Sequence, residues 1–538
     1  MLTPPSNYCI KAGYQSRLTP EYFEDDQAAG TDIVHQPDVY ELAAHLARRL
    51  GCTHILDVGC GRGRKLASLH PEFQVIGIDF GSNIGYCRAN YSFGDWQTAD
   101  LEQPQVFLDA KRLQHTLIVC SDVIEHLKNP EGLLTSLAVA LRHAPLAIIS
   151  TPERDRVRGP HDMGPPANAA HVREWNLDEF SELLSAYGLD IAFHGLTCNN
   201  DRDLEKKTIL SILHGASWAR PQHLDAGNFR VIALMTAYNE EDVIYHAIKH
   251  LTDAGVDVYL IDNWSTDRTI AVAQPLLGKG LIGIEQFPPE GPSGTYDWRP
   301  LLRRVEELAT TLDADWFIHH DADEFRQSPW PELSLKQAFC YADRMGFNAV
   351  DHTVLEFPPV DNGFIPGEDF AHYFVRCSFG QRPGHFLQIK AWKKQTARIS
   401  LAATGGHAVE FANRRVFPYK FLLRHYPIRS QQHGLRKVLS ERMPRFNEVE
   451  RTQLAWHRHY DGIRSDHDFL RDPSSLHDAE QPDFLATFLL ERIAGIGVVR
   501  PTAPSGRDAK SDGKALRLAA IARCWRALQR FWVSLRTG

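Results

Sequence analysis

Closely spaced cysteines are absent from this chain. Its nine cysteines, at positions 9, 52, 60, 87, 120, 198, 340, 377 and 524, include no C-x-x-C pair. Zinc cages and disulfide frameworks both depend on cysteines at characteristic spacings, so this scatter argues against either kind of site. It favours a reducing compartment, and we expect a cytoplasmic protein.

Long apolar runs and an excess of positive charge are absent as well. No stretch approaches the roughly 18 uncharged apolar residues of a membrane-spanning helix, and residues 1–14 lack the pattern of a secretory signal. The formal net charge is −8, so the total does not favour a nucleic-acid partner. With 43% hydrophobic and 23% charged residues in a chain of 538, the composition predicts a soluble protein of several domains.

Two stretches, residues 53–63 and 229–251, each begin an α/β pattern. Each has a buried apolar strand, a turn and then a helical pattern, as in a parallel sheet. We therefore predict an α/β protein of two tandem domains. The expected division is a first domain over residues 1–205, a junction over 206–228, a second domain with a C-terminal helical extension over 229–498, a flexible linker over 499–513 and a basic amphipathic helix over 514–538.

The first domain carries a glycine motif, "LDVGCGRG" at residues 56–63. Glycines let the backbone turn tightly and approach a ligand closely. A second strand follows and ends in Asp79, close to the usual offset of a ribose-binding carboxylate. Over residues 30–200 the sequence resembles the class I S-adenosylmethionine-dependent methyltransferases. A dinucleotide site is the alternative, but the glycine spacing is wrong for it.

This resemblance implies a Rossmann-like seven-stranded sheet and S-adenosyl-L-methionine as the cofactor. In the family the glycine loop lies beside the methionine part, Asp79 would bind the ribose hydroxyls, and Asp100 would lie near adenine. The implied cofactor-binding residues are Asp57, Gly59, Cys60, Gly61, Gly63, Asp79, Asp100 and Asp122. A catalytic base is needed only when the methyl acceptor is a hydroxyl. His126 and His171 are the candidates, and a structural role for each stays open.

In the second domain, a strand runs into Thr-Ala-Tyr-Asn-Glu at residues 236–240, and another ends in Asp262. These features resemble the opening of family 2 glycosyltransferases and related GT-A enzymes. The resemblance implies a nucleotide sugar linked to UDP or GDP as the donor. The expected nucleotide-sugar-binding residues are Ala237, Tyr238, Glu240, Asp262, Arg299 and Asp321.

Two Asp-Ala-Asp triplets flank the next strand, in "DADWFIHHDADEF" at residues 313–325. The first triplet precedes the strand, whereas Asp321 and Asp323 follow it, at the sheet edge where ligands collect. Mg²⁺ or Mn²⁺ prefers such oxygen ligands. We expect Asp321 and Asp323 to bind the metal, with His425 as the histidine ligand that the resemblance adds. Glu356 and Asp361 are candidates for the catalytic base of sugar transfer, and the sequence does not separate them.

The last helical pattern, over residues 514–538, combines an apolar face with six basic residues and no acidic residue. Such a helix is typical of a peripheral membrane anchor, and docking on the same chain or on a twin subunit is equally open. The leading hypothesis is a bifunctional bacterial enzyme with methyltransferase and glycosyltransferase activities, whose acceptor is a glycan or glycolipid of surface-polysaccharide synthesis, at the inner face of the membrane. In one alternative only one domain is active and the other is a scaffold or regulatory module. In another the second domain is a nucleotidyltransferase.

Overall fold

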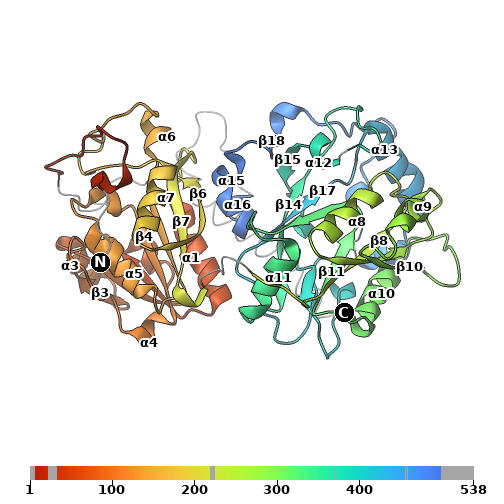
Figure 1. Ribbon diagram of the computed structural model, residues 1–538, viewed down its shortest axis with the longest axis horizontal. Coiled ribbons are helices and arrows are strands. Elements are labelled where there is room, and N and C mark those ends of the chain that lie inside the picture. The colour runs from red at the N-terminus through yellow and green to blue at the C-terminus, as the bar shows by residue number, and fades with distance from the viewer. Residues whose placement is uncertain are drawn as a thin grey trace.

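The computed structural model describes residues 6–21, 33–218, 224–368, 370–454, 456 and 458–498. It contains two α/β halves that lie side by side (Figure 1), which confirms the α/β class, whereas the GT-A identity of the second half stays a prediction. The expected linker and the expected basic helix, residues 499–538, lie outside the described residues. Within the described ranges, no helix is both long and apolar enough to cross a bilayer.

The first half is built on a seven-stranded sheet in the order β3-β2-β1-β4-β5-β7-β6. The first five strands are parallel, and β7 runs antiparallel to both of its neighbours. The strands are β1 (His54–Val58), β2 (Gln74–Asp79), β3 (Asp95–Thr98), β4 (Thr116–Ser121), β5 (Leu146–Pro152), β6 (Asp190–Cys198) and β7 (Lys206–His214). The helices are η1 (Ser6–Cys9), α1 (Pro37–Leu50), α2 (Arg64–Ala67), α3 (Ser82–Asn90), α4 (Ala110–Leu113), η3 (Ile124–His126), α5 (Glu131–Ala140), α6 (Arg154–Arg158) and α7 (Leu177–Ala186).

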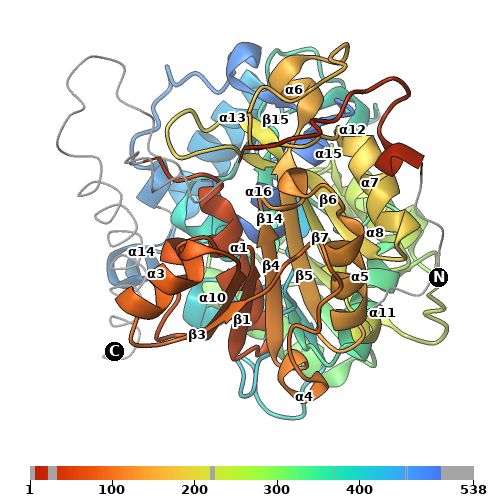
Figure 2. The ribbon, with the colours of Figure 1, turned by 90° about the vertical axis from the view of Figure 1, so that its left-hand side faces the viewer.

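Helices cover both faces of this sheet (Figure 2). Ile55 of β1 packs in the same cluster as α1, whereas the next residue, Leu56, packs in the cluster that contains α5. Successive strand side chains point to opposite faces, so a strand covered on both sides must be apolar throughout. All six residues of β4 are buried for this reason.

The predicted junction over residues 206–228 starts too early. Residues 206–214 form β7, which pairs along its whole length with β5 and β6 inside the first sheet. The segment begins with two charged residues, Lys206 and Lys207, which are typical of a junction. The other seven residues of the strand are all buried. The first half therefore extends at least to His214.

The second half contains two smaller sheets. The first has the order β10-β9-β8-β11-β16-β13, with the first four strands parallel, and the second has the order β12-β17-β14-β15-β18. The strands are β8 (Val231–Ala237), β9 (Asp257–Asp262), β10 (Leu281–Gln286), β11 (Trp316–Asp321), β12 (Glu324–Gln327), β13 (Ala349–Val350), β14 (His352–Glu356), β15 (Arg376–Phe379), β16 (Ala391–Lys393), β17 (Phe421–His425) and β18 (His477–Asp478). The main helices are α8 (Ile244–Asp253), α9 (Thr269–Ala273), α10 (Trp298–Thr311), α11 (Leu335–Arg344), α12 (Phe370–Tyr373), α13 (Gln431–Leu435), α14 (Glu448–Leu454), α15 (Phe484–Thr487) and α16 (Leu489–Ala494).

The two halves pack directly against each other, because one cluster of buried hydrophobic residues includes side chains from both. Trp330 of the second half stacks on Phe193 of β6 with ring centroids 5.4 Å apart, and its indole nitrogen donates to the Ala192 carbonyl at 3.2 Å. His214 of β7 is hydrogen-bonded to the Tyr419 hydroxyl at 2.9 Å. An interface with aromatic stacking and satisfied polar groups makes independent motion of the halves unfavourable.

Candidate active sites

The glycine loop follows β1 at the carboxyl edge of the first sheet. Gly59, Gly61 and Gly63 have φ angles of 83°, 52° and 69°, in the left-handed region that other residues rarely adopt. A Cβ atom on Gly59 would lie 2.2 Å from a methyl carbon of Val123. This glycine is therefore required both by its backbone conformation and by the space beside it.

Asp57 and Asp79 support this loop from the ends of two neighbouring strands. Asp79 accepts hydrogen bonds from the amides of Gly61 and Phe80, both at 2.7 Å. Asp57 is buried, and its Oδ2 accepts from the Tyr40 hydroxyl at 2.7 Å. Its Oδ1 has no hydrogen-bond partner in the part of the chain that the structure describes. Burial raises the pKa of Asp57 to about 6.

The other predicted cofactor residues lie along the same edge. Cys60 is buried within the loop. Asp100 is exposed two residues after β3, and the adjacent Ala99 amide donates to the Asp79 carbonyl at 3.0 Å. Asp122 follows β4 with a φ of 54°, and its amide donates to the Ser150 carbonyl. The structure thus brings the predicted cofactor residues to one edge of the sheet.

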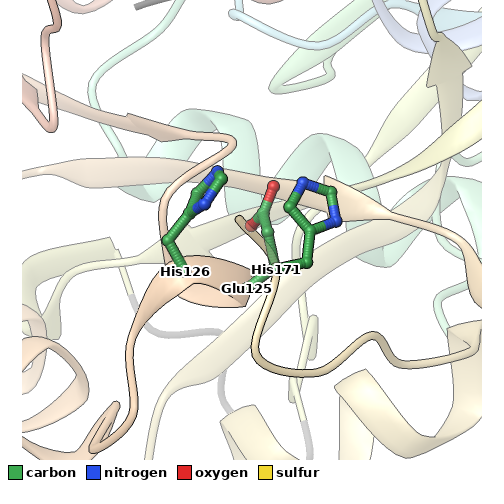
Figure 3. Close-up of side chains that lie close together, drawn as sticks. All are labelled: Glu125, His126 and His171. Carbon is green, nitrogen blue, oxygen red and sulfur yellow. The ribbon is translucent and has the colours of Figure 1, made fainter. Parts of the chain in front are cut away.

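His126 and His171, 45 positions apart in the sequence, lie together beside this edge. Figure 3 shows the Glu125 carboxylate between the two imidazole rings, whose centroids are 4.8 Å apart. One ligand atom from each of Glu125, His126 and His171 lies within 4.8 Å of the others. The sequence analysis named the two histidines but assigned no role to Glu125, although it directly precedes His126.

Hydrogen bonds orient both rings. His171 Nδ1 lies 2.6 Å from a carboxylate oxygen of Glu174, and its Nε2 lies 3.0 Å from the side-chain amide of Asn168. His126 Nδ1 donates to the Ala170 carbonyl at 3.0 Å. Burial and the neighbouring His171 lower the pKa of His126 to about 4. Glu174 was also missed, although it stands only three residues after His171.

Glu125 is fully buried among other carboxylates. Its Oε2 accepts from the Thr151 hydroxyl at 3.0 Å, whereas its Oε1 has no hydrogen-bond partner among the described residues. Burial and the charge of Asp122 raise the pKa of Glu125 well above its ordinary value. A carboxylate and two imidazoles are also a donor set that a divalent cation accepts, so the cluster can hold either a proton or a cation.

In the second half, a cavity of about 480 Å³ opens where the ends of β8 and β11 meet the second sheet. Among the residues predicted for this site, those that line the cavity are Ala237, Tyr238, Glu240, Asp321, Asp323 and His425. Asp262 is buried behind the wall, where its carboxylate accepts from the Ser265 amide at 2.9 Å. Arg299 and Asp361 are exposed and do not contribute to the lining.

A lysine neutralises each carboxylate of the second triplet. Lys390 Nζ lies 2.9 Å from Asp321, and Lys437 Nζ lies 3.0 Å from Asp323 and 2.7 Å from Glu240. Burial alone would raise the pKa of both aspartates, but the lysines and nearby histidines hold it well below the ordinary value. Asp321 and Asp323 are therefore charged and already paired, which the sequence pattern did not predict.

Four arginines to which the sequence motifs gave no role also line the cavity, namely Arg382, Arg442, Arg445 and Arg458. The guanidinium of Arg445 lies 3.9 Å from the centre of the Tyr238 ring, and it donates to the Asn263 side chain at 3.0 Å. Arg442 donates to the Tyr460 hydroxyl at 3.0 Å. Guanidinium groups held by neutral partners keep their charge available for an anion such as a diphosphate.

Comparison with known proteins concerns the first half. A family model described as a methyltransferase domain matches residues 25–192. A protein named "Probable S-adenosylmethionine-dependent methyltransferase" from Mycolicibacterium smegmatis is 30% identical over 168 residues, which are 29% of this chain and 60% of that protein. A ubiquinone biosynthesis O-methyltransferase from Rickettsia akari is 31% identical over 124 residues, 22% of this chain and 47% of that protein.

The chain thus spans about half the length of the curated relatives that it matches. A solved S-adenosylmethionine-dependent methyltransferase from Clostridium acetobutylicum aligns with a TM-score of 0.28 and 12% identity, over 35% of this chain and 95% of that chain. The family match covers β1 to β5 and the glycine loop, together with His126 and His171. The N-terminal region of this chain therefore contains a methyltransferase domain.

Proposed function

We propose that the chain is a bifunctional transferase, in which the first half methylates an acceptor and the second half transfers a sugar. The methyltransferase-domain match over residues 25–192 carries the first activity, because it includes the left-handed glycine loop. S-Adenosyl-L-methionine would supply an electrophilic methyl group. The buried, unpartnered Oδ1 of Asp57 would accept from the ammonium group of its methionine part, and Asp79 would bind the ribose.

For a hydroxyl acceptor, the geometry favours His171 over His126 as the base. Glu174 accepts from Nδ1 of His171 and would stabilise the protonated ring, once the acceptor hydroxyl replaces the Asn168 side chain as the partner of Nε2. The pKa of His126, lowered to about 4 by burial, makes that ring a weak base. His126 and Glu125 would then orient the acceptor beside His171.

A methyl-transfer assay tests this assignment. The full chain is incubated with labelled S-adenosyl-L-methionine and a panel of glycans, glycolipids and small hydroxyl compounds. We expect label in one class of hydroxyl compound. His171→Gln should lower kcat by about 10²–10⁴-fold, as loss of a positioned base does, with an unchanged Kd for the cofactor. Label found only on protein side chains would refute the proposed acceptor class.

For the second half, we propose a GT-A glycosyltransferase of the family 2 type, with a glycan or glycolipid acceptor. Support comes from the parallel strands β8, β9 and β11, because residues at their carboxyl ends line the cavity and ligands of open α/β sheets bind at that edge. Of the lining arginines, Arg442, Arg445 and Arg458 suit the diphosphate of a nucleotide sugar. Of the two candidate bases, Glu356 lies 3.7 Å from His425 of the cavity wall, whereas Asp361 is exposed, so Glu356 is the better placed as long as no metal ion is bound to its carboxylate.

A thermal-shift screen with UDP- and GDP-sugars tests the donor assignment, since a ligand that binds only the native state raises the unfolding temperature by mass action. The expected result is stabilisation by one nucleotide class, and its loss in Arg445→Ala. The lysine pairing of Asp321 and Asp323 favours a second candidate, in which this half is a binding module without transfer activity. Nucleotide-sugar binding without any transfer or hydrolysis would support that alternative.

A further inference from the structure

We propose that Glu356, His385 and His425 form a binding site for a divalent transition-metal ion in the wall of the second-half cavity. From the sequence, the expected metal ligands are Asp321, Asp323 and His425, and His385 has no predicted role. The inference goes beyond the proposed sugar transfer and does not depend on it, because a metal ion can be measured without a substrate.

Strand register brings two of the three residues together. β14 and β17 run parallel, and Glu356 is the direct register partner of His425 at the carboxyl ends of both strands. Cross-strand partners on one face lie close enough for their side chains to meet. His385 comes from the short helix η6 (Pro383–His385), so three separate segments supply the cluster.

The distances suit a bound ion better than direct contact. Glu356 Oε1 lies 3.7 Å from His425 Nδ1 and 3.8 Å from His385 Nε2, and one ligand atom from each residue lies within 4.8 Å of the others. These separations exceed hydrogen-bond lengths. Ligands that each lie about 2.1 Å from a tetrahedral metal are about 3.4 Å apart. Small side-chain shifts would therefore close the three atoms around one ion.

The ring of His385 is almost buried, and a glycine makes room for it. Its side chain is 9% exposed, and its Nδ1 has no hydrogen-bond partner among the residues that the structure describes. A Cβ atom on Gly380 would lie 2.3 Å from that Nδ1, so only glycine at position 380 leaves room for the ring. The nitrogen that would bind the metal is Nε2, which faces Glu356, and a ligand role for Nε2 would give a reason for this close fit of the ring.

Asp323 is placed to orient a ligand rather than to bind the ion itself. Its Oδ1 lies 3.8 Å from His425 Nε2, on the opposite side of the ring from the nitrogen that faces Glu356. Carboxylates behind metal-bound histidines fix the ring and raise its basicity. Lys437 pairs with Asp323 and Glu240, and Lys390 pairs with Asp321 and Glu324, so both aspartates of the triplet are already engaged in ion pairs.

The donor set indicates the class of ion. Two imidazoles and one carboxylate suit Zn²⁺ or Co²⁺ rather than Mg²⁺ or Ca²⁺, which prefer oxygen ligands alone. Three protein ligands leave a coordination position open, and His385 and His425 both line the cavity, so that position faces it. Arg382 contacts Glu356 in competition with the ion, but its side chain is 42% exposed and can swing into solvent.

Cobalt binding to the full chain tests the site. Chelator-treated protein is titrated with Co²⁺, bound metal is counted after dialysis, and Zn²⁺ displaces the visible absorption of bound Co²⁺. His385→Ala should bind one equivalent less than wild type, and Asp323→Asn should bind that equivalent about 10- to 100-fold more weakly. The exposed His372 supplies the control His372→Ala, which should bind as wild type. His171→Ala identifies any cobalt bound by Glu125, His126 and His171 in the first half, because this variant would lose that cobalt and keep the second-half ion.

Gly380→Ala is the second test, because it keeps all three ligands but displaces the His385 ring. It should also lose one equivalent, with the far-ultraviolet circular dichroism of wild type. Full cobalt binding by both His385→Ala and Gly380→Ala would overturn the proposal. So would loss of the ion in Asp321→Asn with full retention in His385→Ala, because that result would place the metal on the triplet.

Discussion

Asparagine in place of Asp79 removes one negative charge from the expected cofactor site while keeping the size of the side chain. Both carboxylate oxygens accept backbone amides, from Gly61 at one oxygen and from Phe80 at the other. An asparagine has only one acceptor oxygen, so one of these amides would face an NH₂ group. We expect the loop to lose its hydrogen bond to residue 79 at whichever of these two amides faces the NH₂ group.

The effect on the cofactor follows from the lost charge. A hydrogen bond to a charged group contributes about 1.5–3 kcal/mol, and each 1.36 kcal/mol is a factor of ten. Loss of one such bond to a ribose hydroxyl therefore weakens binding by about 10- to 150-fold. The exposed Asp100 side chain accepts from the Glu102 amide, and among the described residues no hydrogen bond joins it to the loop, so Asp100→Asn should weaken cofactor binding much less.

Isothermal titration with S-adenosyl-L-homocysteine measures both variants against wild type. The unfolding free energy of each variant is measured in parallel, so that a folding defect is separated from a binding defect. A Kd for Asp79→Asn within threefold of wild type would refute the ribose role. A larger loss of affinity in Asp100→Asn than in Asp79→Asn would assign the ribose role to Asp100 instead of Asp79.

Three further predictions concern the shared core, the pH dependence and the cavity. Trp330→Ala should cost about 3–5 kcal/mol, as other buried aromatic truncations do, and should lower the denaturant midpoint of both halves together; a midpoint change confined to one half would contradict the shared core. Asp57 has its pKa raised from 3.8 to about 6, so its contribution to stability is present below pH 3.8 and is lost as the pH rises through 6. The loss amounts to about 3 kcal/mol, and the ligand-free Asp57→Asn variant should show a flatter unfolding free energy between pH 4 and 7; parallel curves would contradict the buried charge. Arg445→Ala should abolish the thermal shift produced by nucleotide diphosphates, whereas Arg299→Ala should preserve it, and equal shifts in both variants would place the diphosphate elsewhere.

Local sequence pattern was sufficient for the parts of the fold that short segments determine. The strands that end at Val58 and Asp79, the glycine loop between them and the strand that ends at Asp321 could all be read from apolar runs and turn residues. A strand, the turn after it and the following helix are adjacent in the sequence. Their hydrophobic periodicity is therefore visible without knowledge of the distant residues that they pack against. The expected metal, base and sugar-binding roles remain predictions.

The sequence by itself determined the α/β class and the positions of the two strand–turn–helix patterns, at residues 53–63 and 229–251. It also predicted at which edge of each sheet the candidate functional residues lie. Only the tertiary structure decided that residues 206–214 belong to the first sheet, that Glu125 and Glu174 join the two histidines, and that lysines pair with Asp321 and Asp323. It also placed His385 beside Glu356 and His425, the cluster for which we propose a metal ion. The physical reason is that charge pairing and metal geometry depend on distances across strands, and chain order does not encode those distances until the sheets have formed.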